Sequence, residues 1–259
     1  MEEPLEIRIL QEGSEGSDAR SVAVTMRTPG QDFELAAGFL FSEGILHGRD
    51  QIREVTYCQD RGVQNYNIVT VRLREGTPLD ETLLVRNFYT SSSCGVCGKA
   101  SLEAIEMKGC EPLPRGGLAA DPTLLAQLPD RLLEGQSGFQ RTGGLHAAGL
   151  FDAQGELLSL REDVGRHNAV DKVVGEAFLA GALPLTDRIL VVSGRTSFEI
   201  LQKAVSAGIP MVVAVGAPSS LAVELARQFN VTLLGFTRRD RFNLYAGQER
   251  VLGRTGGEG

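Results

Sequence analysis

Alternating and helical patterns of apolar residues predict a small α+β unit within residues 1–85. The stretch 33–41 is mostly apolar and predicts a helix, with Asp32 as a candidate N-cap and Gly44 as its stop. Strands are predicted on either side of this helix, at 20–28, 52–58 and 65–73.

The pattern becomes regular from residue 121 onward. Helices are predicted at 121–134, 167–179, 198–207 and 219–229. The first of them is expected to begin with Asp121 as its N-cap and Pro122 at its first position. Strands are predicted at 146–151, 156–160, 188–192, 211–215 and 231–236. The last three strands are near-continuous runs of Val, Ile and Leu, which are typical of a parallel sheet covered on both faces. The order αββαβαβαβ resembles the cytidine-deaminase fold, so the expected fold class is α/β with a smaller N-terminal α+β domain.

A segment rich in Gly and Pro, 109–122, separates the two patterns. We therefore predict two domains, an N-terminal α+β domain at 1–108 and a deaminase-like α/β domain at 109–259.

Charge and composition narrow the functional classes. The chain has 259 residues, a net charge of −7 and a pI of about 5.1, which argues against a general nucleic-acid binder. Residues 186–259 nevertheless carry 9 basic and 6 acidic side chains, so this segment can hold a local anion site. Since no apolar run is long enough to span a bilayer and the acidic start lacks an apolar signal region, we expect a cytoplasmic protein with no membrane partner.

The first candidate for chemistry is the pair Cys94 and Cys97, which lies in a run of small polar residues and glycine at 88–101. Such a CxxC pair can bind a metal, cycle as a dithiol, or supply one nucleophile with a neighbour. Zinc needs two further ligands, and Cys58 and Cys110 each stand alone, so no metal is predicted. Flanking glycine and serine also argue against two buried structural cysteines.

Two readings of the CxxC pair stay open at this point. A dithiol oxidoreductase is disfavoured because the preceding run of Thr and Ser does not have the pattern of a strand entering a helix. The other is an exposed thiol on a mobile loop, with Lys99 favouring its thiolate form. A thiol with such reach suits carriage of a persulfide between partners.

Two turns at strand ends are candidates for binding a phosphate-bearing ligand. Residues 193–197, which include Gly194 and Arg195, and residues 216–220 each follow a buried strand and open a helix. Ligands of open α/β sheets bind at this edge, beside helix N-termini. Plain helix capping is the structural alternative for either turn.

The end of the last predicted strand is a third candidate, because arginines can clamp phosphates there. A solvated basic turn is the alternative. The residues concerned are Phe236, Thr237, Arg238, Arg239, Asp240 and Arg241.

The stretch 161–168 passes from a strand into a helix, whose N-terminus can bind an anion because Gly165 permits close approach. Its Asp163 and His167 can shape the site, move protons, or simply cap and pack. A zinc deaminase would need metal-binding thiolates at the starts of the helices at 167 and 198, and the sequence has none there. Deaminase chemistry is therefore not expected even on that fold.

Taken together, these motifs resemble the formate dehydrogenase accessory sulfurtransferase family, FdhD. The resemblance rests on five motifs in this order, at 33–44, 94–98, 142–148, 162–172 and 193–195. It covers nearly the whole chain.

The resemblance implies a sulfur carrier that accepts persulfide sulfur from a cysteine desulfurase. The sulfur is passed to the bis-molybdopterin guanine dinucleotide form of the molybdenum cofactor, on which formate dehydrogenase activity depends. Cys94 matches the family's persulfide carrier, Cys97 matches its second cysteine, and 236–241 match its cofactor-binding stretch. The family also implies a homodimer and a deaminase-like C-terminal half without zinc. The alternative function is a molybdenum-cofactor-binding chaperone in which the thiols are not required.

Overall fold

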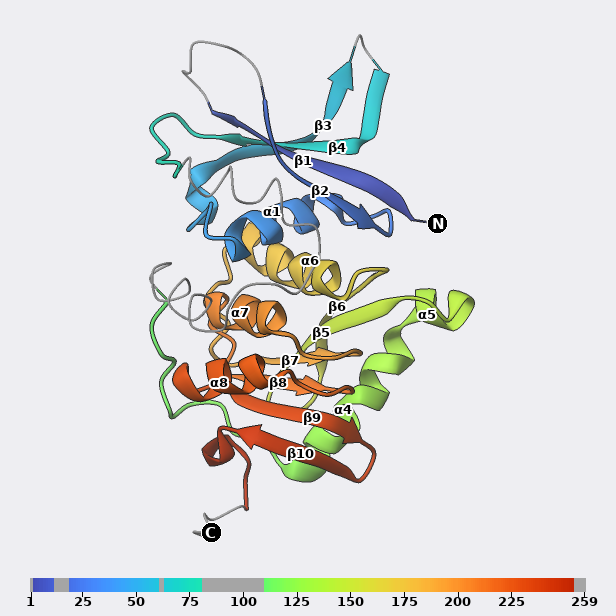
Figure 1. The fold of residues 1–259 in the computed structure, drawn as a ribbon, viewed down its shortest axis with the longest axis vertical. Helices are drawn as coiled ribbons and strands as arrows, with labels where there is room; N and C mark the ends of the chain where they lie inside the picture. The colour runs from blue at the N-terminus through green and yellow to red at the C-terminus, as the bar shows by residue number, and fades with distance from the viewer. Residues whose placement is uncertain (1, 12–18, 61–62, 81–109, 254–259) are drawn as a thin grey trace.

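The chain folds into two sheets with helices packed between them. The structure is a computed structural model and describes residues 2–11, 19–60, 63–80 and 110–253. In Figure 1 the N-terminal sheet lies at the top, α1 and α6 lie in the middle, and the larger sheet lies below. No helix in these ranges is long and apolar enough to cross a membrane.

The N-terminal sheet has four strands in the order β2-β1-β4-β3. Their bounds are β1 Glu3–Gln11, β2 Arg20–Arg27, β3 Ile52–Asp60 and β4 Val63–Leu73. The sequence analysis missed β1, although Leu5, Ile7 and Ile9 alternate in its sequence and are buried in the structure. These three side chains pack against α1 (Asp32–Ser42), whose Leu35 and Leu40 belong to the same cluster of buried residues.

The larger sheet has six strands in the order β10-β9-β8-β7-β5-β6. Their bounds are β5 His146–Phe151, β6 Leu157–Asp163, β7 Ile189–Val192, β8 Met211–Ala214, β9 Thr232–Arg238 and β10 Arg241–Ala246. The expected parallel arrangement is confirmed for β7, β8 and β9. The sheet as a whole is mixed, because β5, β6 and β10 pair with their neighbours in antiparallel fashion.

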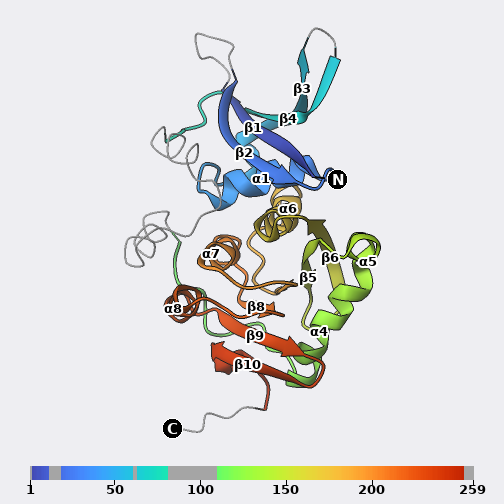
Figure 2. The same ribbon diagram turned by 45° about the vertical axis from the view of Figure 1, so that its right-hand side comes forward.

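Helices cover both faces of this sheet, as Figure 2 shows. One face is packed by α6, α7 and α8 and the other by α4, with separate clusters of buried side chains on the two sides. The helices are α4 Pro122–Gly135, α5 Ser137–Thr142, α6 Arg166–Leu179, α7 Phe198–Ser206 and α8 Ser220–Gln228, with short 3-10 turns η1 Arg49–Gln51 and η2 Gln248–Arg250. Neither α5 nor β10 was anticipated.

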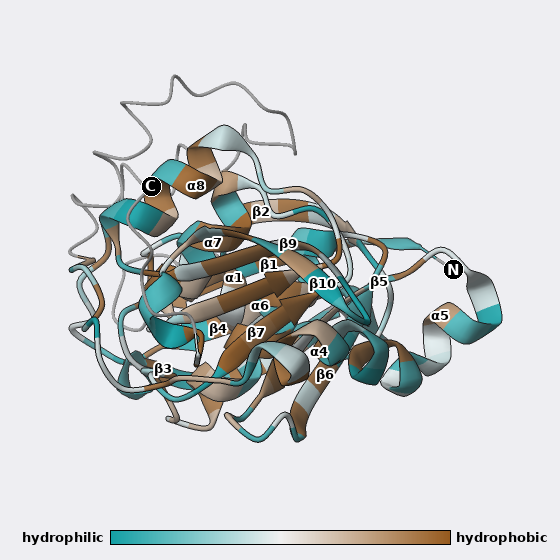
Figure 3. Cartoon of the chain, turned by 90° about the horizontal axis from the view of Figure 1, so that it is seen from below, coloured by the Kyte–Doolittle hydropathy of each residue, from teal (hydrophilic) through white to brown (hydrophobic). Residues whose placement is uncertain are grey.

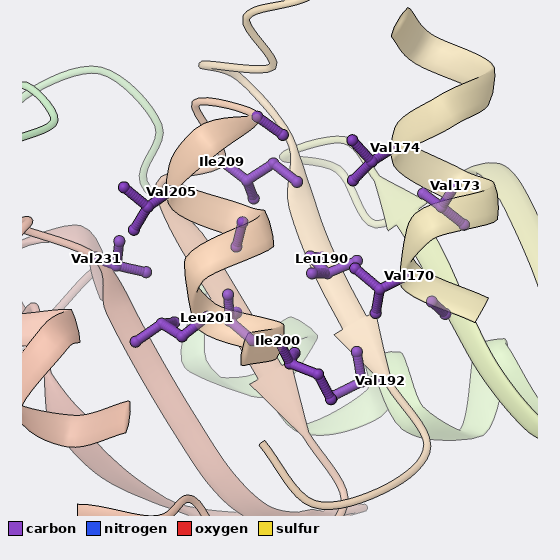
Figure 4. Close-up of a cluster of buried hydrophobic side chains, with 14 of the residues drawn as sticks. Val170, Val173, Val174, Leu190, Val192, Ile200, Leu201, Val205, Ile209 and Val231 are labelled. Atoms are coloured by element: carbon purple, nitrogen blue, oxygen red, sulfur yellow. The ribbon is translucent and has the colours of Figure 1, made fainter. Parts of the chain in front are cut away.

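Alternate residues of the central strands belong to the two different clusters of buried side chains. Leu190 and Val192 of β7 point toward α6 and α7 (Figure 4), whereas Ile189 and Val191 belong to the cluster on the α4 side. Figure 3 shows these strands in brown at the centre of the molecule, with more hydrophilic helix surfaces outside. Burial on both faces explains why the strand sequences are continuously apolar.

The caps predicted from sequence have mixed outcomes. Asp121 does cap α4, because its carboxylate accepts hydrogen bonds from the backbone nitrogens of Thr123 (2.8 Å) and Leu124 (3.3 Å). Asp32 is not the N-cap of α1, as Gln31 occupies that position. The Asp32 carboxylate is instead buried against Arg27, with two contacts of 3.0 Å. An ion pair with Arg27, five residues earlier at the end of β2, has replaced the cap.

The helices α1 and α6 cross in very close contact at two glycines. A Cβ atom on Gly38 would lie 1.9 Å from the carbonyl oxygen of Asp171, and one on Gly175 would lie 1.8 Å from that of Glu34. Only glycine permits this approach of two helix backbones. The crossing joins the N-terminal sheet to the larger sheet. The proposed division at residues 108 and 109 lies outside the described residues and stays a prediction.

We predict that Gly38→Ala lowers the free energy of unfolding by about 1–3 kcal/mol, because the added methyl group forces the two helices apart. Gly116→Ala is the matched control, since nothing lies within 4 Å of its added Cβ and its φ is not positive. Denaturant unfolding of both variants measures the effect. Equal losses in the two variants would contradict the close crossing.

Candidate functional site

The carboxyl ends of β7, β8 and β9 form one continuous edge, as the sequence predicted. The backbone nitrogen of Gly216 donates to the carbonyl oxygen of Gly194 (3.0 Å), and that of Phe236 donates to the carbonyl oxygen of Gly216 (3.1 Å). The structure thus brings two of the predicted site residues, Gly194 and Phe236, to the same edge. A Cβ on Gly216 would lie 2.9 Å from the Arg195 nitrogen, so the loops stack because Gly216 has no side chain.

Arg195 is exposed at this edge and makes no hydrogen bond or ion pair with the described residues. The next residue, Thr196, is fully buried and forms an isolated β-bridge with Pro218. Its Oγ1 has no partner among the described residues. The bridge fixes the loop that carries Arg195, so its guanidinium is held on a defined backbone.

Phe236 lies within β9 in an unusual backbone conformation. Its φ is 51°, in the left-handed region that bulky side chains rarely adopt, and its side chain is 43% exposed. The neighbouring Thr237 is buried, and its Oγ1 has no described partner. Strained backbone of this kind occurs preferentially at functional sites.

The basic stretch that follows is the turn of the β9–β10 hairpin. Arg238 and Arg241 are paired in register, and all four residues from Arg238 to Arg241 are exposed. The Nε of Arg239 donates to the Asp130 carboxylate of α4 at 3.0 Å. Arg239 is therefore directed toward the α4 side of the sheet, whereas the guanidiniums of Arg238 and Arg241 make no hydrogen bond or ion pair with the described residues. Phosphate binding by this stretch stays a prediction.

His146 lies beside Gly194, and it is close enough to His167 for the two side chains to interact electrostatically. A Cβ on Gly194 would be 3.3 Å from Nδ1 of His146 and 3.8 Å from Cδ of Arg166. His167, in the first turn of α6, has its Nε2 2.9 Å from Oγ of Ser197 at the start of α7. His146 belongs to a motif that the sequence analysis quoted without a role, and Ser197 lies in the predicted loop.

Both imidazoles are held in the neutral form. Burial, together with the charges of Arg166 and Lys203, lowers the pKa of His167 to about 4, although Glu199 acts in the opposite direction. Burial and the Arg166 charge also lower the pKa of His146. At neutral pH these side chains are hydrogen-bonding groups rather than cations.

Asp163 is a structural residue, because its fully buried carboxylate has four partners. Oδ1 accepts from the backbone nitrogen of Gly165 (2.8 Å) and from Asn168 (3.0 Å). Oδ2 accepts from the backbone nitrogen of Thr28 (3.0 Å) and forms an ion pair with Lys172 (2.8 Å). With both of its oxygens engaged by donors, the carboxylate anchors the start of α6 to the backbone that follows β2.

A second buried ion pair joins α6 to α7 and α1. Asp171 lies 2.7 Å from Nζ of Lys203 and accepts a hydrogen bond from Ser42 at 3.1 Å. Burial raises the pKa of Asp171 to about 6 in spite of the Lys203 charge. This network holds the two helix N-termini at the candidate site in a fixed relation.

The predicted sulfur carriers Cys94 and Cys97 lie outside the described residues. Of the other two cysteines, Cys58 is in β3 and Cys110 has its Sγ 3.7 Å from Oγ of Ser206, beside a pocket of about 280 Å³. Both are free thiols. Among the described residues, no three His, Cys, Asp or Glu side chains form a group that could hold a metal.

Comparison with known proteins agrees with this geometry. The model of the FdhD/NarQ family matches residues 1–252. The chain belongs to the FdhD/NarQ family. The expectation drawn from the sequence motifs is therefore confirmed, and the family match spans both sheets and the CxxC pair.

Individual relatives of the family are similar along almost their full length. "Sulfur carrier protein FdhD" of Streptomyces avermitilis is 53% identical over 256 residues, covering 96% of this chain and 87% of the relative. The protein of the same name from Mycobacterium tuberculosis is 47% identical over 262 residues, covering 97% and 90%. A crystal structure of a formate dehydrogenase accessory protein from Desulfotalea psychrophila matches with a TM-score of 0.72 and 26% identity, covering 97% of this chain and 90% of that one.

We predict that Asp163→Asn lowers the free energy of unfolding by about 3–5 kcal/mol, because it leaves the buried Lys172 charge without its partner. Asp187→Asn is the matched control, since Asp187 is exposed and pairs with Arg188 at the surface. The free energy of unfolding of Asp187→Asn should fall by less than about 1 kcal/mol. Denaturant unfolding measures both values, and a small loss for Asp163→Asn would refute its anchoring role.

The stability of the protein should depend on His167 between pH 6.5 and 4. The unfolded chain binds a proton near the ordinary pKa of 6.5, whereas the folded chain resists protonation down to about 4. The contribution of the neutral His167 imidazole to the free energy of unfolding is therefore fully present above pH 6.5, and it is lost as the pH falls toward 4. The difference in unfolding free energy between the wild type and His167→Gln should shrink or reverse over this range. A difference that does not vary with pH would contradict the neutral state.

Proposed function

We propose that this protein carries sulfur as a persulfide on Cys94. It receives the sulfur from a cysteine desulfurase and delivers it to the bis-molybdopterin guanine dinucleotide form of the molybdenum cofactor, for use by formate dehydrogenase. The observation that carries the proposal is the family match over residues 1–252, which spans a CxxC pair flanked by glycine. Relatives are named sulfur carrier proteins, and a structural relative is a formate dehydrogenase accessory protein.

The transfer step uses the chemistry of a thiolate. The Cys94 thiolate attacks the outer sulfur of the donor persulfide, the donor sulfur–sulfur bond breaks, and the donor cysteine leaves as a thiolate. Cys94 then carries the outer sulfur with its proton, and nothing is oxidised or reduced overall. Cys97 assists onward transfer, or its thiolate attacks the Cys94 sulfur of the persulfide, so that a Cys94–Cys97 disulfide forms and the outer sulfur leaves as hydrosulfide.

The edge of the larger sheet suits a substrate that carries phosphates. The exposed guanidiniums of Arg195, Arg238 and Arg241 have no partner among the described residues, and Gly194 and Gly216 leave the backbone open to close approach. The spatial order β6-β5-β7-β8-β9 supports the expected deaminase-like arrangement of this half. A homodimer and a cytoplasmic location are part of the same proposal.

The test is an intact-mass spectrum after incubation with an active cysteine desulfurase and cysteine. We expect the wild type to gain one sulfur that thiol reduction removes, because only a persulfide adds sulfur reversibly in this way. The gain should disappear in Cys94→Ala and persist in Cys97→Ala. Cys110→Ala is the matched control and should keep the gain.

The same variants separate the proposal from its alternatives. Activation of formate dehydrogenase should be lost with Cys94→Ala. If activation survives that substitution and no form gains sulfur, the protein is a cofactor-binding chaperone. If both cysteines are needed for disulfide exchange with a generic substrate and neither gains sulfur, it is a dithiol oxidoreductase.

A further inference from the structure

The face of the N-terminal sheet that points away from α1 has an apolar end. Val24 and Met26 alternate along β2 and are 63% and 51% exposed. Met26 is paired in register with Pro4 of β1, which is also exposed. Tyr66 of β4 is 60% exposed, and its carbonyl oxygen accepts a hydrogen bond from the Arg27 guanidinium at 3.1 Å, so it lies close to the end of β2. We call the residues Pro4, Val24, Met26 and Tyr66 the β2 patch.

The rest of this face is polar, as the uncovered face of a sheet normally is. Arg8 pairs with Glu6 at 2.8 Å, and Arg72 pairs with Glu54 at 2.9 Å. Among the described residues, the helix α1 covers only the opposite face of this sheet, and no other helix lies on the outer one (Figure 1). A group of exposed apolar side chains on an otherwise polar face indicates a surface that binds another protein.

The β2 patch adjoins the carboxyl edge of the larger sheet through α6. The side-chain nitrogen of Asn168 donates to the carbonyl oxygen of Met26 at 2.8 Å, and Thr25 Oγ1 lies 3.3 Å from Asn168 Oδ1. Two residues earlier in α6, the Cδ atom of Arg166 lies 3.8 Å from the position that a Cβ of Gly194 would take. Figure 1 shows the N-terminus and the carboxyl end of β9 on the same side of the molecule. A protein bound to the β2 patch is therefore placed next to the edge that suits a phosphate-bearing substrate.

The size and the charge of the patch favour a transient partner over a second copy of this chain. A stable interface takes roughly 20–30 residues from each side, and four exposed side chains form the apolar centre of a smaller one. The rim beside the start of β1 is acidic, because Glu2 is exposed and Glu3 shares the Arg27 guanidinium with Asp32. An isologous contact would set this rim against a copy of itself and bring like charges close. The surface therefore fits a partner that presents apolar side chains surrounded by Lys or Arg.

We propose that the β2 patch is the docking surface for the enzyme that receives the cofactor, the catalytic subunit of formate dehydrogenase in its cofactor-free form. The inference rests on the proposed function, which supplies both the cargo and its recipient. A recipient docked on the patch faces the carboxyl edge from which the cofactor would leave. The cysteine desulfurase, in contrast, needs to reach only Cys94.

The test is the affinity for the purified, cofactor-free catalytic subunit of a formate dehydrogenase, measured by biolayer interferometry. Met26→Lys should weaken binding about tenfold or more, because a charge at the centre of an apolar interface loses its water and meets the basic residues of the partner. Leu252→Lys is the matched control and should leave the affinity unchanged. Leu252 is 52% exposed, and its backbone nitrogen donates to Ala120, away from the N-terminal sheet.

A second variant keeps the test valid if the first one does not fold. Val24→Ser removes apolar area without adding a charge and should weaken binding in the same direction, by a smaller factor. Thermal unfolding verifies that each variant is folded. Unchanged binding in both variants, or no binding of the subunit by the wild type, would overturn the inference.

Two further measurements separate the docking surface from its alternatives. If Met26→Lys weakens binding of the cysteine desulfurase and not of the dehydrogenase subunit, the patch serves the sulfur donor and the inference is wrong. If the variant changes the oligomeric state on size-exclusion chromatography, a second copy covers the patch and the inference is also wrong. Sulfur loading on Cys94 is measured in the same samples and should not differ between Met26→Lys and the wild type. Docking that depends on Met26 in a protein that never gains sulfur would refute only the persulfide proposal.

Discussion

The buried carboxylate of Asp163 is the contact on which the arrangement of the candidate site depends. It binds the backbone after β2 through Thr28, the first turn of α6 through Gly165 and Asn168, and the Lys172 ammonium. These partners come from both halves of the chain, so the anion can be satisfied only when the halves are docked. Because α6 carries Arg166 and His167 on its first turn, the same contact sets where those side chains lie relative to Gly194.

The glycine crossing of α1 and α6 complements this polar anchor. Gly38 and Gly175 let two backbones approach so closely that neither position tolerates even a methyl group without movement. Close packing gives the α1–α6 contact its shape. The Ser42 hydroxyl of α1 donates to Asp171 of α6, whose carboxylate is also paired with Lys203 of α7, so this buried network ties the three helices together. A buried ion pair contributes little net stability, because desolvating its charges is costly. Our hypothesis is that this pair instead favours one arrangement of the helices over others.

How far the sequence predicted the structure depended on the range of the interactions involved. The C-terminal helices and central strands followed from local periodicity, and the Asp121 cap followed from the Asp-Pro pair. The local rule failed at Asp32, because its partner Arg27 lies on a neighbouring strand and offers a stronger contact than a cap. The strand β10 was missed because the basic run before it was interpreted as a phosphate-binding stretch or a solvated turn, and not as the turn of a hairpin. The buried Arg166 Nε without a described partner is a property of the folded surroundings, and no sequence pattern reports it.

Charge and burial together divide the carboxyl edge of the sheet into two kinds of surface. Arg195, Arg238 and Arg241 are exposed, where guanidiniums attract phosphates from solution without a large desolvation cost. Arg166 is half-buried beside two neutral histidines and a carboxylate, where a second charge would be costly but a directional donor and acceptor are well defined. The carboxyl edge therefore offers charged donors on its exposed loops and uncharged, directional groups beside the start of α6.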